Sequence, residues 1–287
     1  MALNGIPLVK YLIMSNLSQL KKITDTFPIQ ESLMPVLFMV HGSPMNGIED
    51  NEFSRTWRTI SKSIPMPNAV LVVSAHWFTK GTFITAMDFP PTIHDFGGFP
   101  QALFDVNYPS PGDPKLALET SQLLSVEVML DHDWGLDHGA WTVVRHMYPE
   151  ANVPVLQLSI DYTKETRFHY ELAKELYSLR KKGVLIMGSG NMVHNLRMIS
   201  WDMINGGGYD WALEMNDRFK NLILNNDHMP LMDYRKLGAE AMLAIPTPEH
   251  YLPLMYTLGL KGDREEVVLF NDKTIGGSLT MTSVKIG

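Results

Sequence analysis

The chain has 287 residues, of which 45% are hydrophobic and 19% are charged, a composition that supports a globular protein with a sizeable core. Its 24 Lys and Arg against 31 Asp and Glu give a net charge of −7, which would repel a phosphate backbone, so we expect no nucleic-acid partner. Because there is no cysteine, disulfide scaffolds, thiolate metal sites and cysteine nucleophiles are excluded, and any metal must be held by His and carboxylate side chains.

The first 32 residues are interpreted as an arm or a short helix that precedes one main domain, 33–287. Their most apolar part, Ile6–Met14, is interrupted by Lys10 and lacks a cleavage site made of small residues, which argues against a secretory signal. No apolar run approaches the ~18 residues that a membrane span needs. We therefore expect a cytoplasmic protein with no membrane partner.

Short apolar runs rich in β-branched residues predict buried strands, and they alternate with helical patterns along the chain. Strands are expected at Pro35–Val40, Ala69–Ser74, Thr82–Met87, Val126–Leu130, Pro154–Ile160, Val184–Gly188 and Leu279–Ile286. The clearest helix is expected over Lys164–Lys182 with Thr163 as its N-cap, and weaker helices over Pro114–Leu124, Tyr209–Leu224 and Tyr251–Leu258. The alternation predicts a single-domain α/β fold with a central, mostly parallel or mixed sheet flanked by helices.

The segment 89–112 has no regular period and is dense in Pro, Gly and aromatic residues. Long irregular loops in compact domains often form lids or the walls of binding sites. The alternative is a connector that happens to pack well.

Three histidines follow predicted strands. His41 comes directly after Val36–Val40, His76 directly after Val70–Ala75, and His194 a few residues beyond the strand that ends at Gly188. In open α/β sheets ligands bind outside the carboxyl ends of the strands, so these imidazoles could converge on a metal or catalytic cluster there. Taken singly, each is as readily interpreted as a hydrogen-bonded structural residue.

The other histidines are harder to assign. His250 lies in a proline-rich turn just before a predicted helix, where a capping or surface role is the alternative, and His138 and His94 have the same ambiguity. We expect the remaining four to be solvated, because they lie in charged or helical contexts: His132, His146, His169 and His228. No Gly-x-Ser-x-Gly nucleophile elbow and no His-Glu-x-x-His helix occurs.

Six stretches of the chain together resemble the class III extradiol ring-cleaving dioxygenases (the LigB-like superfamily), and within it the DOPA 4,5-dioxygenase-like branch. They are His41-Gly-Ser-Pro-Met-Asn, Val73-Ser-Ala-His76-Trp, Pro91-Thr-Ile-His94-Asp-Phe-Gly-Gly-Phe-Pro, Asp137-His138-Gly139, Gly188-Ser-Gly-Asn-Met-Val-His194-Asn-Leu-Arg and Pro246-Thr-Pro-Glu-His250-Tyr-Leu-Pro. They occur in the family's order from about residue 33 onward, and their combination is highly specific.

The resemblance implies a mononuclear metal held by His41, His76 and a third ligand from the last motif. We expect that ligand to be His250, although the adjacent Glu249 offers the carboxylate that many extradiol enzymes use. His194 is implied to be the active-site base and a fourth ligand when no substrate is present. His138 is expected to assist catalysis, and His94, His138 and His194 to contact the substrate.

The implied reaction is the insertion of O₂ into a catechol with ring opening. Fe(II) suits it because the ion keeps open positions for catechol and O₂, and a histidine suits the base because its pKa lies near physiological pH. Zn(II) fits the same ligands but has no redox chemistry. Two other functions remain open on the residues alone: a zinc-dependent hydrolase using the same cluster, and a non-catalytic binding protein on the same fold.

Overall fold

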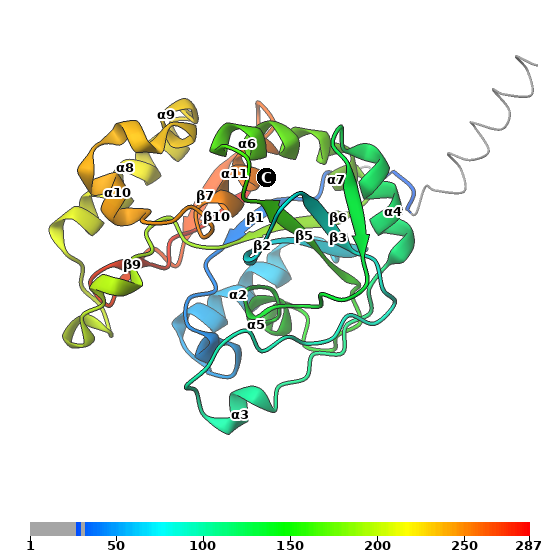
Figure 1. Cartoon of the computed structure of the whole chain (residues 1–287), viewed down its shortest axis with the longest axis horizontal. Helices are drawn as coiled ribbons and strands as arrows, with labels where there is room; N and C mark the ends of the chain where they lie inside the picture. Colours follow the sequence, from blue (N-terminus) through cyan, green and yellow to red (C-terminus); the bar gives the residue numbers. More distant parts are fainter. Residues whose placement is uncertain (1–26, 30–31) are drawn as a thin grey trace, which may run out of the picture.

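The computed structural model describes residues 27–29 and 32–287, so the predicted N-terminal arm lies almost entirely outside the described residues (Figure 1). A mixed eight-stranded sheet in the order β4-β3-β5-β2-β6-β1-β10-β7 forms the centre. Its strands are β1 (Val36–Met39), β2 (Ala69–Thr79), β3 (Thr82–Thr85), β4 (Val128–Asp131), β5 (Val155–Asp161), β6 (Val184–Ser189), β7 (Val267–Phe270) and β10 (Ser283–Ile286). A separate two-stranded sheet pairs β8 (Thr274–Ile275) with β9 (Leu279–Thr280).

Four central strands, β5, β2, β6 and β1, run parallel to one another, and antiparallel pairs occur toward both edges, between β3 and β5, β1 and β10, and β10 and β7. Every residue of β1, β5 and β6 is buried, as expected for parallel strands covered on both faces. The predicted single-domain α/β fold with a mixed sheet is therefore confirmed.

Helices cover both faces of the sheet (Figure 1). On one face lie α2 (Glu52–Ser63) and α5 (His138–Met147), on the other α6 (Thr166–Glu175), α7 (Tyr177–Lys181) and α11 (Leu252–Gly259), and α4 (Pro114–Leu123) lies beside β3 and β4. Next to β7, α8 (Asp210–Leu224), α9 (Met229–Met232) and α10 (Ala239–Ala244) form a further group. Short elements complete the chain: η1 (Pro44–Gly47), α3 (Gln101–Phe104), η2 (Leu196–Met198), η3 (Trp201–Met203) and η4 (Tyr234–Leu237). Within the described ranges, no helix is long and apolar enough to cross a membrane.

The helix predicted over Lys164–Lys182 is two helices, α6 and α7, separated at Leu176. The side chain of Leu176 is fully buried, so the predicted apolar face is preserved across the break. Thr163 is not the N-cap, because its hydroxyl donates to Asp161 Oδ1 at 2.7 Å in the turn that follows β5. Glu165 occupies the N-cap position instead, without a side-chain hydrogen bond.

Two strand boundaries differ from the prediction in ways that affect the site. β2 continues to Thr79, past the predicted end at Ser74, and its register against β5 shifts between Val73 and Phe78. His76 therefore lies within the irregular last part of β2, and not after the strand. The predicted strand Leu279–Ile286 is divided between β9 and β10, which belong to different sheets.

Candidate metal centre

Five histidines from different elements meet at the carboxyl end of the parallel strands. His41 follows β1, His76 lies in the last part of β2, and His194 lies in the loop beyond β6. His138 is the first residue of α5, and His250 comes just before α11. The fold thus brings together all four residues predicted as metal ligands and adds His138 to them.

The ring positions divide the cluster into two parts. His41, His76 and His138 each offer one ligand atom within 4.8 Å of the others, and the His76 and His138 ring centroids lie 3.9 Å apart. The His250 ring lies 5.7 Å from that of His41 and 5.1 Å from that of His76. His194 stacks on His250, with centroids 3.7 Å apart and planes inclined by 12°.

Burial lowers the pKa of three site histidines, His41, His76 and His194, and so keeps them neutral. His41 is 2% exposed, and burial followed by the neighbouring imidazoles holds the pKa of both His41 and His76 well below the usual range. Burial, with a further contribution from His250, lowers the pKa of His194 to about 2. Neutral imidazole is the form that binds a metal or accepts a proton.

Outer hydrogen bonds determine which ring nitrogens carry lone pairs. Ser189 Oγ donates to the carbonyl oxygen of Gly139 at 2.6 Å, so it accepts from His41 Nδ1, which lies 2.9 Å away. The Asp95 carboxylate can only accept, and its Oδ2 lies 3.3 Å from His76 Nδ1. Both rings then carry their lone pair on Nε2, and these two Nε2 atoms lie 3.0 Å apart. Two lone pairs facing each other at this distance repel unless a cation neutralises them, so these residues fit a metal ion.

The last motif offers two adjacent candidate ligands with different surroundings. Glu249 Oε1 accepts from Thr247 Oγ1 at 2.6 Å; burial alone would raise the pKa of Glu249, but hydrogen bonds from His250 and Thr247 lower it to about 2. His250 Nδ1 lies 3.5 Å from that same oxygen, is buried, and has no aligned hydrogen-bond partner. The Glu249 carboxylate therefore has an aligned hydrogen-bond donor in Thr247, whereas His250 Nδ1 has no aligned partner.

Glycines let the backbone come close to two of the ligands. A Cβ at Gly190 would lie 2.2 Å from the carbonyl oxygen of His250, and one at Gly139 would lie 2.8 Å from the His76 ring. A side chain at either position would displace the ligand it touches. Both glycines fall in the motifs that carry the resemblance, but their steric role is visible only in three dimensions.

His94 is not part of the cluster. Its Nε2 donates to the carbonyl oxygen of Val106 at 3.0 Å, and its ring packs against Phe96 and Trp141. Phe96 itself reaches the cluster, with its ring 5.6 Å from that of His138 in an edge-to-face arrangement. Phe96, two residues further along the same loop, thus lies closer to the cluster than His94, whose substrate contact stays a prediction.

The prediction that four histidines are solvated is right for His132, which is exposed, and wrong for His169 and His228. His169 is fully buried and pairs with the Tyr256 hydroxyl, and His228 is 7% exposed and pairs with the Tyr170 hydroxyl. His146 is half-buried, with Nε2 donating to the Asn46 carbonyl oxygen at 2.7 Å. Tyrosine and backbone partners that are remote in sequence made burial possible, and no local pattern indicates them.

The sequence reasoning assigned no role to Asp95 or Ser189. Asp95 Oδ1 accepts from the His138 backbone N–H at 2.9 Å and lies 2.9 Å from His138 Nδ1. Burial opposes ionisation of Asp95, but hydrogen bonding to His138 and the charges of His138 and His76 hold the pKa of this carboxyl below its usual range. The signal available beforehand was that both residues lie inside motifs that carry the family resemblance.

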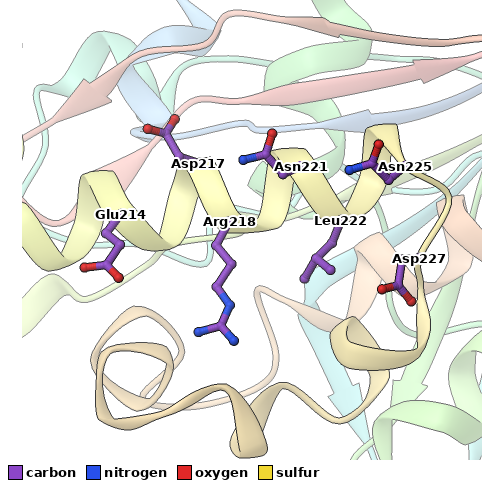
Figure 2. Close-up of a pocket in the computed structure, with 7 residues that line it drawn as sticks. All are labelled: Glu214, Asp217, Arg218, Asn221, Leu222, Asn225 and Asp227. Atoms are coloured by element: carbon purple, nitrogen blue, oxygen red, sulfur yellow. The ribbon is translucent and has the colours of Figure 1, made fainter.

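A separate open groove runs along α8 (Figure 2). Glu214, Arg218 and Leu222 extend from one side of the helix, while Asp217 and Asn221 extend from the other. No site histidine lines this groove, so we assign it no part in the chemistry of the cluster.

Comparison with known proteins agrees with the geometry. A family model described as the catalytic LigB subunit of aromatic ring-opening dioxygenase matches residues 34–280. The chain belongs to this family. It is an enzyme of the extradiol ring-cleaving class. The 4,5-DOPA dioxygenase extradiol of Escherichia coli (strain K12) is 46% identical over 98% of this chain and 99% of its own length.

More distant relatives extend the family across kingdoms. The 4,5-DOPA dioxygenase extradiol of Beta vulgaris is 34% identical over 89% of this chain and 97% of its own length. A crystal structure of an uncharacterized protein from Escherichia coli K12 has a TM-score of 0.77 and 41% identity, covering 88% of this chain and all of the other. The resemblance to extradiol dioxygenases predicted from the motifs is therefore confirmed.

Proposed function

We propose that this enzyme opens the ring of a DOPA-like catechol beside its two hydroxyl groups, using Fe(II) held by His41, His76 and His250. The observation that carries the proposal is the pair of neutral imidazoles whose Nε2 lone pairs face each other at 3.0 Å. The names of the relatives from Escherichia coli and Beta vulgaris support the choice of a DOPA-like substrate. The catalytic domain is assigned to 33–287, and its cytoplasmic location stays a prediction.

His250 is the third ligand in this proposal because its ring lies beside those of His41 and His76, whereas the Glu249 carboxylate already accepts from Thr247. His138 is the competing candidate, since it belongs to the tightest donor group, but the family resemblance implies a third ligand from the motif that contains His250. We therefore assign His138 to the substrate side of the site. His194, stacked on His250, becomes a fourth ligand only when substrate is absent.

When bound, Fe(II) supplies the redox chemistry that joins a catechol to O₂, both of which need open positions on the ion. The chain supplies the proton transfers. His194 is neutral and accepts the second catechol proton at a ring nitrogen; a catecholate beside it raises its pKa toward the working range, because a nearby negative charge favours the imidazolium. Phe96 offers an aromatic edge next to His138, suited to holding the substrate ring.

Metal reconstitution without O₂ tests the proposal. The protein is loaded with Fe(II) under anaerobic conditions, mixed with a panel of catechols including DOPA, and exposed to air while O₂ uptake and the yellow ring-opened product are measured. Zn(II)-loaded protein should bind the catechol without consuming O₂. His132→Ala, at an exposed histidine outside the site, serves as the matched control. Stoichiometric Fe(II) without O₂ uptake on any catechol would overturn the proposal.

A further inference from the structure

Asp95 contacts two site imidazoles with one carboxylate. It belongs to the irregular segment between β3 and α3, and its side chain is 18% exposed. Oδ2 lies 3.3 Å from His76 Nδ1, and Oδ1 lies 2.9 Å from His138 Nδ1. The same Oδ1 accepts from the His138 backbone N–H at 2.9 Å. One backbone N–H and two ring nitrogens, from two residues, therefore lie around one carboxylate.

We propose that Asp95 is a positioning residue that fixes the tautomer and orientation of His76 and His138 together, so that both present an Nε2 lone pair to the site. The role of Asp95 in catalysis rests on the proposed function. Its effect on the tautomers of His76 and His138 does not. Because a carboxylate only accepts hydrogen bonds, each ring must place its hydrogen on Nδ1 to satisfy it.

A carboxylate is the side chain that fits these contacts. It has about four lone-pair sites on two oxygens, enough for all three donors, whereas an amide has one oxygen and directs N–H groups at whatever faces its nitrogen. Its negative charge also increases the basicity of the imidazoles that donate to it, which strengthens a metal–histidine bond. His41 differs, because its outer partner is the neutral Ser189 hydroxyl.

The two histidines are coupled because their rings are neighbours. Their centroids lie 3.9 Å apart with planes inclined by 48°, so rotation of one ring moves the other. A single carboxylate across both Nδ1 atoms holds this pair as a unit. Loss of Asp95 should therefore affect a predicted metal ligand and a predicted substrate-side residue at once.

The segment that carries Asp95 is anchored independently of the carboxylate. Trp141 Nε1 donates to the Ile93 carbonyl oxygen at 2.9 Å, and His94 Nε2 donates to that of Val106. The Phe96 ring packs against Phe104, with centroids 5.2 Å apart. We therefore expect Asp95→Asn to keep the fold of this segment.

The test compares Asp95→Asn with Asp105→Asn, an exposed carboxylate at the C-terminal end of α3 whose side chain accepts from Gln101. Zn(II) affinity is measured by competition with a chromophoric chelator. We expect Asp95→Asn to weaken it by about 10- to 100-fold, the usual effect of losing a carboxylate behind a ligating histidine, and Asp105→Asn to leave it within about twofold. Equal affinities in the two variants would overturn the proposal.

Nitrogen-15 NMR of the metal-free protein determines the tautomers of His76 and His138 directly. In the wild type, His76 and His138 should both carry hydrogen on Nδ1, and in Asp95→Asn both should shift toward the Nε2–H form that predominates in water. Wild-type spectra with Nε2–H on either ring would overturn the proposal even if the variant fails to fold. Neither readout needs turnover, so failure to open any catechol would reject the proposed function alone.

Discussion

Two groups of largely buried histidines differ in what their ring nitrogens face. His169 and His228 each have a tyrosine hydroxyl 3.0 Å from Nδ1, and burial is the main cause that lowers the pKa of each to about 4. His41 and His76 are likewise kept neutral by burial, but face each other through Nε2. Burial and a low pKa therefore do not mark a metal ligand.

The difference lies in the direction of the unsatisfied lone pairs. In the site, Ser189 and Asp95 satisfy the outer nitrogens and direct both Nε2 lone pairs toward a common point. At His169 the partner is a single phenol on one side of the ring. A metal site is therefore recognised by convergent lone pairs whose opposite ring nitrogens already have partners.

The strongest test of this comparison removes one of the converging nitrogens. His41→Ala or His76→Ala should abolish stoichiometric metal binding and all catechol-dependent O₂ uptake, because an open three-ligand site loses most of its affinity with one donor. His169→Gln should retain full metal. Elemental analysis after anaerobic loading measures both, and full metal in either site variant would contradict the assignment.

A second test separates the adjacent candidates Glu249 and His250. His250→Ala should lose the metal, whereas Glu249→Ala should keep it, since the carboxylate already accepts from Thr247. The measurement is metal content under limiting Fe(II). The opposite pattern would make the carboxylate the third ligand, and metal loss in His138→Ala with retention in His250→Ala would transfer the role to His138.

A third test concerns His194, whose ring is positioned by stacking on His250. His194→Phe preserves an aromatic ring for that stack while removing the base. We expect metal content and melting temperature close to wild type and a turnover reduced by about 10²- to 10⁴-fold, the usual range for one acid–base group. The single-turnover rate is measured on the same metal-replete preparation. Wild-type turnover would exclude a role as base.

The smallest effect is expected for the buried histidines outside the site, of which His169 is one, and it concerns how the free energy of unfolding changes with pH. The pKa of His169 is about 4 in the fold against 6.5 for a free histidine, so the unfolded chain binds the proton first. Its stabilising contribution is complete above pH 6.5 and declines as the pH falls toward 4, by at most about 3 kcal/mol. In metal-free protein, His169→Gln should flatten urea-unfolding free energies between pH 7.5 and 5, and an unchanged slope would contradict this.

The parts of the fold that could be predicted are those whose pattern is continuous and apolar. The buried strands β1, β5 and β6 appear in the sequence as unbroken apolar runs. β7 was not predicted, although Val267–Phe270 is also an unbroken apolar run; its residues are half-buried or exposed at the sheet edge. α5 was missed because nearly every residue in it is buried, which removes the amphipathic period that identifies a helix.

The site could be predicted as a set of residue types but not as a geometry. Strand ends and motifs indicated His41, His76, His194 and His250, and the fold brings them together. The motifs did not reveal that Asp95 would reach His76 and His138, because this contact depends on how an irregular segment folds back over β2. The burial of His169 likewise depends on Tyr256, which is remote in sequence.

The spacing of the site residues along the chain has a consequence for how the protein matures. The proposed ligands lie at positions 41, 76 and 250, and the proposed base at 194, so the centre draws on segments from nearly the whole described chain. Ribosomes add about 5–20 residues per second, and contacts between such distant segments form late. Uptake of the proposed Fe(II) should therefore be the closing event of biogenesis: a stalled nascent chain that ends before His250 should carry no stoichiometric iron, and the released chain should acquire it.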